Sequence, residues 1–191
     1  MVKTCLLTVG STRFDQLVSA FLLPDSLESL SDLGVNHVVA QVGNSLLPPG
    51  YHLGTTALPG GVRLEVFRFA GDLEEQVGNA DLVVSHAGAG SLLSFIRPLS
   101  TSGGSSPGRA AHRKLVLVPN STLMDSHQSD LAEEMDKKGW ATICWTPEDL
   151  PPTLRGLGKG RDVQTGTAQS AFPELDKGKV QRILNEVLGY A

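Results

Sequence analysis

Short apolar runs alternate with amphipathic stretches along most of the chain, and this alternation restricts the possible folds more than any other feature of the sequence. Parallel strands need a long crossover between them, usually a helix, so the alternation predicts a parallel sheet covered on both faces. We therefore expect an α/β fold, a single Rossmann-like domain over residues 1–191. The runs that predict strands are residues 2–9, 37–42, 63–69, 81–85, 114–118 and 141–145.

The segments between these strands carry helix signals. Thr12 and Asp15 have the spacing of a capping box, so a helix is expected to begin near Thr12 and to end at Pro24. Asp25 is expected to begin a second short helix, and Gly34 suits its end. Further helices are predicted over residues 72–79, from the glycines near 90 to about 96, over 124–138 and over 176–188, and loops are predicted over 43–61 and 151–173.

The composition excludes several classes of protein. A net charge of −4 without a run of Lys or Arg argues against a nucleic-acid partner. Cys5 and Cys144 lie in apolar runs and are expected to pack as small apolar side chains, since two cysteines give neither a disulfide framework nor a zinc spacing. No signal peptide or membrane segment is visible, so we expect a cytoplasmic protein that meets a membrane only through a partner. The Ser- and Gly-rich residues 98–110 predict a low-complexity insertion without chemistry.

The segment after the fourth predicted strand is the first candidate for binding chemistry. Residues 85–91 (SHAGAGS) join a strand to the start of a helix, where backbone N–H groups lack helical partners and the helix dipole is positive. Gly88 and Gly90 remove side chains, which would let a diphosphate approach the backbone, and Ser91 adds a hydroxyl. The alternative is a tight turn that needs glycine. His86 could contact a phosphate or sugar oxygen, or it could be a hydrogen-bonded structural residue.

Two other strands end in polar segments at the same predicted edge of the sheet. Gly10 and Ser11 follow the first strand, either as part of a binding crevice or as ordinary residues before a helix. After the fifth strand, Asp125, His127 and Gln128 could bind sugar hydroxyls; the alternatives are a helix cap for Asp125 and a solvated helix face for the other two. Ligands of such sheets bind beyond the carboxyl ends of the strands, so these segments are expected to face one crevice.

Three segments carry a resemblance to a known family: LTVGSTRFDQL at 6–16, DLVVSHAGAGS at 81–91 and KLVLVPNSTLMDSHQSDLAEEM at 114–135. Together they resemble the catalytic subunits of the eukaryotic transferase that adds the second N-acetylglucosamine (GlcNAc) to dolichyl-diphosphate-GlcNAc in asparagine-linked glycosylation. That family is similar to the C-terminal domain of the bacterial transferase MurG. The resemblance covers nearly the whole chain, except residues 98–110 and 151–172. It implies the C-terminal, donor-binding half of a GT-B glycosyltransferase, whose other half is a membrane-anchored partner chain.

The resemblance also implies what such a chain does. It would be an inverting hexosyltransferase that binds UDP-GlcNAc and acts only with its partner. That partner would recruit it to the cytosolic face of the endoplasmic reticulum and would carry the dolichyl-diphosphate-GlcNAc acceptor side. The residues implied are Gly88, Ala89, Gly90 and Ser91 for the diphosphate of UDP, Asn120, Asp125, His127 and Gln128 for GlcNAc, and Gly10 and Ser11 on the acceptor side of the cleft.

One position departs from the family pattern. Relatives usually carry an acidic residue for the ribose hydroxyls where this chain has Ser94, and a serine binds ribose more weakly than a carboxylate does. No metal or other cofactor is expected, because no DxD-type motif is evident, and His86 is the candidate general base unless the partner supplies one. The alternatives are a non-catalytic nucleotide-binding regulatory module and a Rossmann dehydrogenase, and the missing G-x-G-x-x-G motif disfavours the dehydrogenase.

Overall fold

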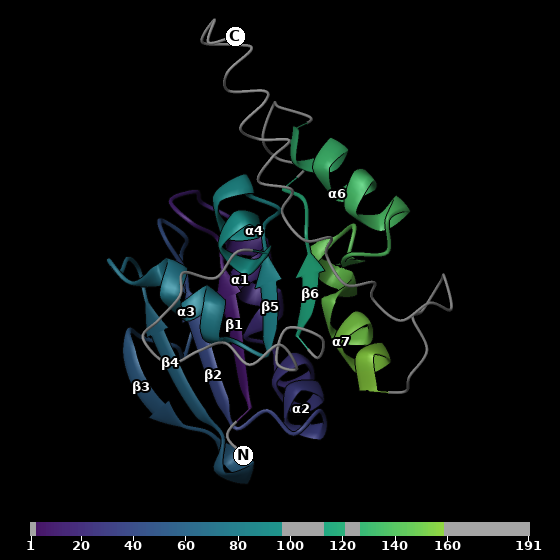
Figure 1. Ribbon diagram of the computed structural model, residues 1–191. Coiled ribbons are helices and arrows are strands. Elements are labelled where there is room, and N and C mark those ends of the chain that lie inside the picture. The colour runs from purple at the N-terminus through teal and green to yellow at the C-terminus, as the bar shows by residue number, and fades with distance from the viewer. Residues whose placement is uncertain (1–2, 97–112, 121–126, 159–191) are drawn as a thin grey trace, which may run out of the picture.

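Seven strands form one sheet in the computed structural model, which describes residues 3–96, 113–120 and 127–158 (Figure 1). Each of the six apolar runs predicted as strands contains one, so that prediction is confirmed. The strands are β1 (Thr4–Thr8), β2 (His37–Gln41), β3 (Gly54–Ala57), β4 (Arg63–Phe67), β5 (Leu82–Ser85), β6 (Lys114–Leu117) and β7 (Thr142–Ile143).

The strand order is β3-β4-β2-β1-β5-β6-β7, and every neighbouring pair is parallel except β3 with β4. Without the antiparallel edge strand β3, this is the order of the Rossmann sheet, so the predicted fold class is confirmed. The order reverses between β1 and β5, and a doubly wound sheet binds its ligand where this reversal opens a crevice. In Figure 1 the carboxyl ends of β1 and β5 reach the same edge of the sheet, beside α4 (Ala89–Ile96).

Helices cover both faces of the sheet and divide the core into two clusters (Figure 1). Phe21 and Leu30 belong to the cluster on one face, which also holds Cys5 and Cys144. Both thiols are buried and free, as predicted, and burial raises the pKa of Cys144 to about 11. The helices on this face are α1 (Asp15–Phe21), α2 (Pro24–Asp32) and α7 (Leu150–Gly158); α3 (Leu73–Asn79), α4 and α6 (His127–Lys137) lie on the other, and short 3-10 turns span Pro59–Gly61 and Pro147–Asp149.

Arg113 ties two helices together at the start of β6. Its guanidinium donates to the backbone carbonyls of Ala80 and Val77 at the end of α3 and to the carbonyl of Phe95 near the end of α4. The same guanidinium lies 4.2 Å from the centre of the Phe95 ring, a cation–π contact. A charged donor group thus satisfies carbonyls that helix ends leave without partners, and it fixes α4 against α3.

Two predicted loops contain regular structure. β3 lies within residues 43–61, and α7 overlaps residues 151–173, so both loop predictions were wrong. The prolines Pro151 and Pro152 argued against a helix, but they occupy the first turn of α7, where a missing N–H breaks no helical hydrogen bond. Buried leucines at positions 150, 154 and 157 hold this helix against the sheet.

The predicted capping box at Thr12 was also wrong. Helix α1 begins at Asp15, and the Thr12 hydroxyl instead donates to the carbonyl of Val9 at 2.6 Å. The Asp15 carboxylate accepts from the N–H of Leu46 at 2.9 Å and pairs with Arg13, which lowers the pKa of Asp15. The side chains of Thr12 and Asp15 therefore bind backbone groups around the β1–α1 junction, whereas their spacing in the sequence had suggested a helix cap.

Other sequence predictions fall outside what the structure describes. The segment 98–110, Asp125 and the helix predicted over 176–188 all lie in ranges that are not described. Within residues 3–96, 113–120 and 127–158, no helix has the length and apolar character needed to cross a bilayer.

Candidate functional site

The start of α4 presents backbone N–H groups at the carboxyl edge of β5. Gly88 accepts the first helical hydrogen bond, from the N–H of Leu92 at 3.1 Å, so Ala89, Gly90 and Ser91 form the first helical turn. The N–H groups of that turn have no partner within the helix. Ala89 and Gly90 are exposed, and a Cβ atom added to Gly90 would meet nothing within 4 Å. This end of the helix is therefore open to an anionic ligand.

His86 lies beneath this turn and is only 6% exposed. Its Nδ1 atom lies 3.2 Å from the carbonyl oxygen of Thr8, and its ring occupies the space beside two glycines. A Cβ on Gly88 would lie 2.6 Å from His86 Cε1, and one on Gly10 would lie 3.1 Å from the same atom. The absence of a side chain at Gly88 therefore makes room for the imidazole, a requirement that the sequence interpretation had assigned to an approaching diphosphate.

The surroundings of His86 determine its charge and its tautomer. Burial lowers the pKa of the imidazole below its ordinary value of 6.5, while the hydrogen bond with Thr8 opposes this shift. The ring is therefore neutral at pH 7. A carbonyl can only accept, so Nδ1 carries the proton and donates to Thr8, which leaves Nε2 as an acceptor.

The segment after β1 is held in place by the side chain of Gln41. Gly10 has a left-handed backbone with φ of 60°, its N–H donates to Gln41 Oε1 at 2.9 Å, and its carbonyl accepts from Gln41 Nε2 at 2.7 Å. Ser11 is exposed, and its carbonyl accepts from the Asn44 side chain. The predicted cleft residues Gly10 and Ser11 thus lie on a turn with a fixed backbone, and a Cβ atom added to Gly10 would lie within 3.1 Å of the His86 ring.

Asn120, which follows β6, links that end of the sheet to the chain that follows β1. It is almost fully buried, its N–H donates to Gln128 Oε1 at 3.0 Å, and its side chain donates to the carbonyl of Arg13 at 3.3 Å. The side-chain oxygen of Gln128 is therefore already hydrogen-bonded to the protein backbone. His127 is the first residue of α6, and its side chain lies outside the described part of the chain.

The structure thus brings the three predicted segments to one edge of the sheet, through Gly10 against His86 and through Asn120 bound to Arg13. Ser94 lies one turn along α4 from Gly90, and its hydroxyl donates to the Gly90 carbonyl at 3.0 Å. That bond uses the hydroxyl proton of Ser94 within the helix itself.

Three polar residues beneath these segments were not among the predicted site residues. Thr8, Gln41 and Ser85 stand side by side across β2, β1 and β5, and all three are fully buried. The signal was present, because a glutamine within the apolar run HVVAQV is unusual for a buried strand. Buried polar side chains usually have hydrogen-bond partners, and Gln41 finds its partners in the Thr8 hydroxyl and in the backbone of Val9, Gly10 and Arg68. The Ser85 hydroxyl, in contrast, has no hydrogen-bond partner among the described residues.

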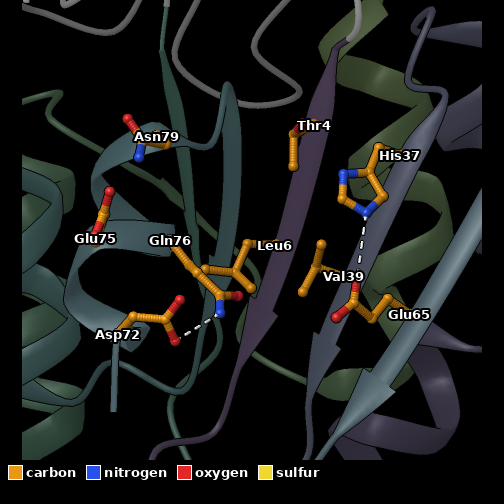
Figure 2. Close-up of a pocket in the computed structure, with 9 residues that line it drawn as sticks. All are labelled: Thr4, Leu6, His37, Val39, Glu65, Asp72, Glu75, Gln76 and Asn79. Carbon is orange, nitrogen blue, oxygen red and sulfur yellow. Dashed lines mark hydrogen bonds and ion pairs between the residues drawn. The ribbon is translucent and has the colours of Figure 1, made fainter. Parts of the chain in front are cut away.

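A separate cavity of about 360 Å³ lies toward the amino ends of the strands (Figure 2). Figure 2 shows His37 pointing toward Glu65 of the neighbouring strand β4 on one wall of this cavity, with a distance of 3.6 Å between Nε2 and the carboxylate. The α4 start and His86 lie at the opposite end of the strands and do not line the cavity. Among the residues that the structure describes, no three His, Cys, Asp or Glu side chains are grouped so that they could hold a metal ion. The cavity is lined by Thr4, Leu6, His37, Val39, Glu65, Asp72, Glu75, Gln76 and Asn79.

Comparison with known proteins finds a matching family model and several similar proteins. Residues 4–98 match the glycosyltransferase family 28 C-terminal domain. The UDP-N-acetylglucosamine transferase subunit ALG13 of Cryptococcus neoformans is 34% identical over 210 residues, covering 98% of this chain and 97% of that protein. A solution structure of ALG13 matches with a TM-score of 0.60 and 22% identity over 98% of this chain and 97% of that one. MurG of Acinetobacter baumannii matches with a TM-score of 0.53 and 22% identity, over 83% of this chain and 41% of MurG.

Proposed function

Because the chain belongs to the ALG13 family of UDP-N-acetylglucosamine transferase subunits, we propose that it binds UDP-GlcNAc and provides the donor half of a two-chain glycosyltransferase. The acceptor in this proposal is dolichyl-diphosphate-GlcNAc, to which the enzyme adds the second GlcNAc. The observation that carries the proposal is the open start of α4, where Gly90 leaves free space beside backbone N–H groups.

The diphosphate of UDP would lie at this helix start. The N–H groups of Ala89, Gly90 and Ser91 point out of the first turn, and the helix dipole adds a partial positive charge. Both features favour an anion, and both act most strongly on the charge that develops as UDP leaves. This is why the proposal assigns charge stabilisation to the backbone and includes no metal.

The reaction would be an inverting displacement at the anomeric carbon of GlcNAc. The acceptor hydroxyl oxygen forms a bond to that carbon, the bond from the carbon to the diphosphate oxygen breaks, and UDP leaves with the electron pair. The hydroxyl proton passes to a general base. In this proposal Asn120, which follows β6, and Gln128 in α6 lie on the GlcNAc side, together with Asp125 and His127.

His86 is the candidate for the general base within this chain. It is neutral at pH 7 and its Nε2 is an acceptor, as a base requires. Its burial between Gly10 and Gly88 restricts the directions from which a hydroxyl could reach it. A base supplied by the partner chain is the alternative, and replacement of His86 distinguishes the two.

The partner in this proposal is a membrane-anchored chain that forms the other GT-B half. The Cryptococcus relative is named a subunit, which supports the presence of a partner chain. That partner would recruit the chain to the cytosolic face of the endoplasmic reticulum. Deletion of residues 176–191 should abolish co-purification with the partner if this segment docks to it.

A second candidate function is a non-catalytic nucleotide-binding module, which Ser94 favours because it lacks the charge of a ribose-binding carboxylate. The deciding experiment is a calorimetric titration of UDP-GlcNAc into the chain, alone and with its co-expressed partner, followed by transfer to a lipid-linked diphosphate-GlcNAc. Binding with transfer supports the donor half of an enzyme. Binding without transfer by the assembled pair supports the regulatory module, and no binding in either state contradicts both.

A further inference from the structure

We propose that Gln41 is a positioning residue for the reaction. It fixes the segment that follows β1 (residues 9–11, the β1 segment) at Gly10, and so it sets the position of the acceptor side of the cleft relative to His86. The inference rests on the proposed function for its link to turnover. Gln41 is the last residue of β2 and is fully buried. Apart from His37, the other residues of β2 are apolar, and the Gln41 side chain points under the β1 segment.

The hydrogen bonds of Gln41 use both ends of its amide. Oε1 accepts from the Thr8 hydroxyl at 2.8 Å, from the N–H of Val9 at 3.1 Å and from the N–H of Gly10 at 2.9 Å. Nε2 donates to the carbonyl of Gly10 at 2.7 Å and to the carbonyl of Arg68 at 2.6 Å. Three donors surround one end and two carbonyls surround the other, so only one orientation of the amide satisfies them all.

The hydrogen bonds of Gln41 connect it to the chain on both sides of β2. On one side, Gln41 binds the backbone of Arg68, whose guanidinium donates to the carbonyls of Gly43 and Ser45. On the other side, a Cβ atom added to Gly10 would lie only 3.1 Å from His86 Cε1, so a shift of Gly10 changes the space beside the imidazole. Gln41 is thus the single side chain among the described residues that bonds both the N–H and the carbonyl of Gly10.

The position of Gly10 matters more for the acceptor than for the donor. The N–H groups at the start of α4 are held by the helix and by β5, and neither depends on a bond from Gln41. Gly10 and Ser11, in contrast, line the acceptor side in the proposed function. We therefore expect a Gln41 variant to lose turnover while it keeps UDP affinity.

The test uses Gln41→Glu, which keeps an accepting oxygen but replaces the Nε2 donor with a second oxygen. That oxygen faces the carbonyls of Gly10 and Arg68, so both lose their donor. Although the Gly10 N–H keeps its acceptor, repulsion between the new oxygen and the Gly10 carbonyl should open the segment more often. In the full chain, amide hydrogen exchange at Gly10 should therefore accelerate by roughly tenfold or more, while exchange at Val116 in β6 stays unchanged. With the co-expressed partner, kcat should fall by roughly tenfold or more, and the Kd for UDP should stay within about threefold.

Ser26→Ala is the matched control, because it also removes a buried hydrogen bond, the one from Ser26 Oγ to the carbonyl of Ala20, far from the β1 segment. It should leave Gly10 exchange and kcat unchanged. Unchanged exchange at Gly10 in Gln41→Glu would overturn the proposal, as would equal acceleration at Val116 or a parallel loss of UDP affinity. If Gln41→Glu does not fold, Gln41→Met removes the same donor without adding a charge. Failure of the wild-type chain to bind UDP-GlcNAc would instead refute the proposed function, and the exchange result would still decide whether Gln41 fixes Gly10.

Discussion

The imidazole of His86 occupies the volume that any side chain at Gly88 would need, with His86 Cε1 only 2.6 Å from the position of a Cβ atom there. The histidine and the glycine are two residues apart on the turn from β5 into α4, so a strongly local contact shapes the helix start. The residue between them, Ala87, has a left-handed backbone with φ of 59°, which bends the chain sharply enough to bring the two together.

Gly88→Ala should therefore destabilise the protein by about 1–3 kcal/mol, because the added methyl group forces the ring to move. Chemical denaturation measures the change. The double variant Gly88→Ala/His86→Ala should recover much of the loss, since it removes the ring that the methyl group strikes. Additive effects of the two substitutions would show that the contact does not limit Gly88.

Substitution of Gly90 should separate folding from binding. A Cβ atom has free space there, and alanine favours a helix over glycine by up to about 1 kcal/mol, so Gly90→Ala should fold at least as well as the wild type. Gly90→Asp should lower UDP affinity by roughly a hundredfold, because a carboxylate repels the diphosphate and crowds its N–H donors. The neutral Gly90→Asn distinguishes charge from bulk, and calorimetric titration with UDP measures all three. Wild-type affinity in Gly90→Asp would place the diphosphate elsewhere.

Replacement of His86 tests the general base. His86→Asn keeps a donor toward the Thr8 carbonyl but removes the accepting ring nitrogen. If His86 is the base, kcat of the assembled enzyme should fall by about 10²–10⁴-fold while UDP affinity stays near that of the wild type. A loss of less than about fivefold would assign the base to the partner.

The pH dependence of stability should also report on His86. Burial holds the pKa of the folded-state imidazole below the ordinary value of 6.5, so the unfolded chain binds a proton more readily. This contribution is complete above pH 6.5 and is lost as the pH falls through the folded-state pKa. The free energy of unfolding should thus decrease below pH 6.5, and less steeply in His86→Asn.

Ser94→Glu should strengthen nucleotide binding. The substitution restores the carboxylate that relatives are expected to carry, and a charge-assisted bond to ribose should raise UDP affinity by about three- to tenfold. The gain should disappear with 2′-deoxy-UDP and should be absent in Ser94→Gln. An equal gain for both nucleotides would mean that the carboxylate does not contact the ribose.

Much of the sheet could be predicted because most of its strands are recognisable from their own residues. The buried parallel strands β1, β2, β5 and β6 are nearly continuous apolar runs, as strands covered on both faces must be. The edge strand β3 has the sequence GTTA and is mostly exposed, so no apolar pattern marks it. Its pairing with β4 is a tertiary contact that no local property of these residues indicates.

The candidate site was predictable to a similar degree. The glycines, hydroxyls and His86 at the strand ends were expected to meet at one edge of the sheet, and they do, because the carboxyl ends of parallel strands share that edge in this fold. The partners of those residues were not predictable. Gln41 and Gly10 are 31 positions apart, and Asn120 and Arg13 are 107 positions apart, so their contacts exist only once the sheet has assembled.

The bond from Arg113 to the carbonyl of Phe95 spans 18 positions in sequence and pins together the two points from which residues 97–112 depart. The end of α4 is thereby held to α3 and β6. The direction of the helix axis, and with it the aim of the N–H groups near Gly90, is therefore set in part by a guanidinium at the opposite end of the helix.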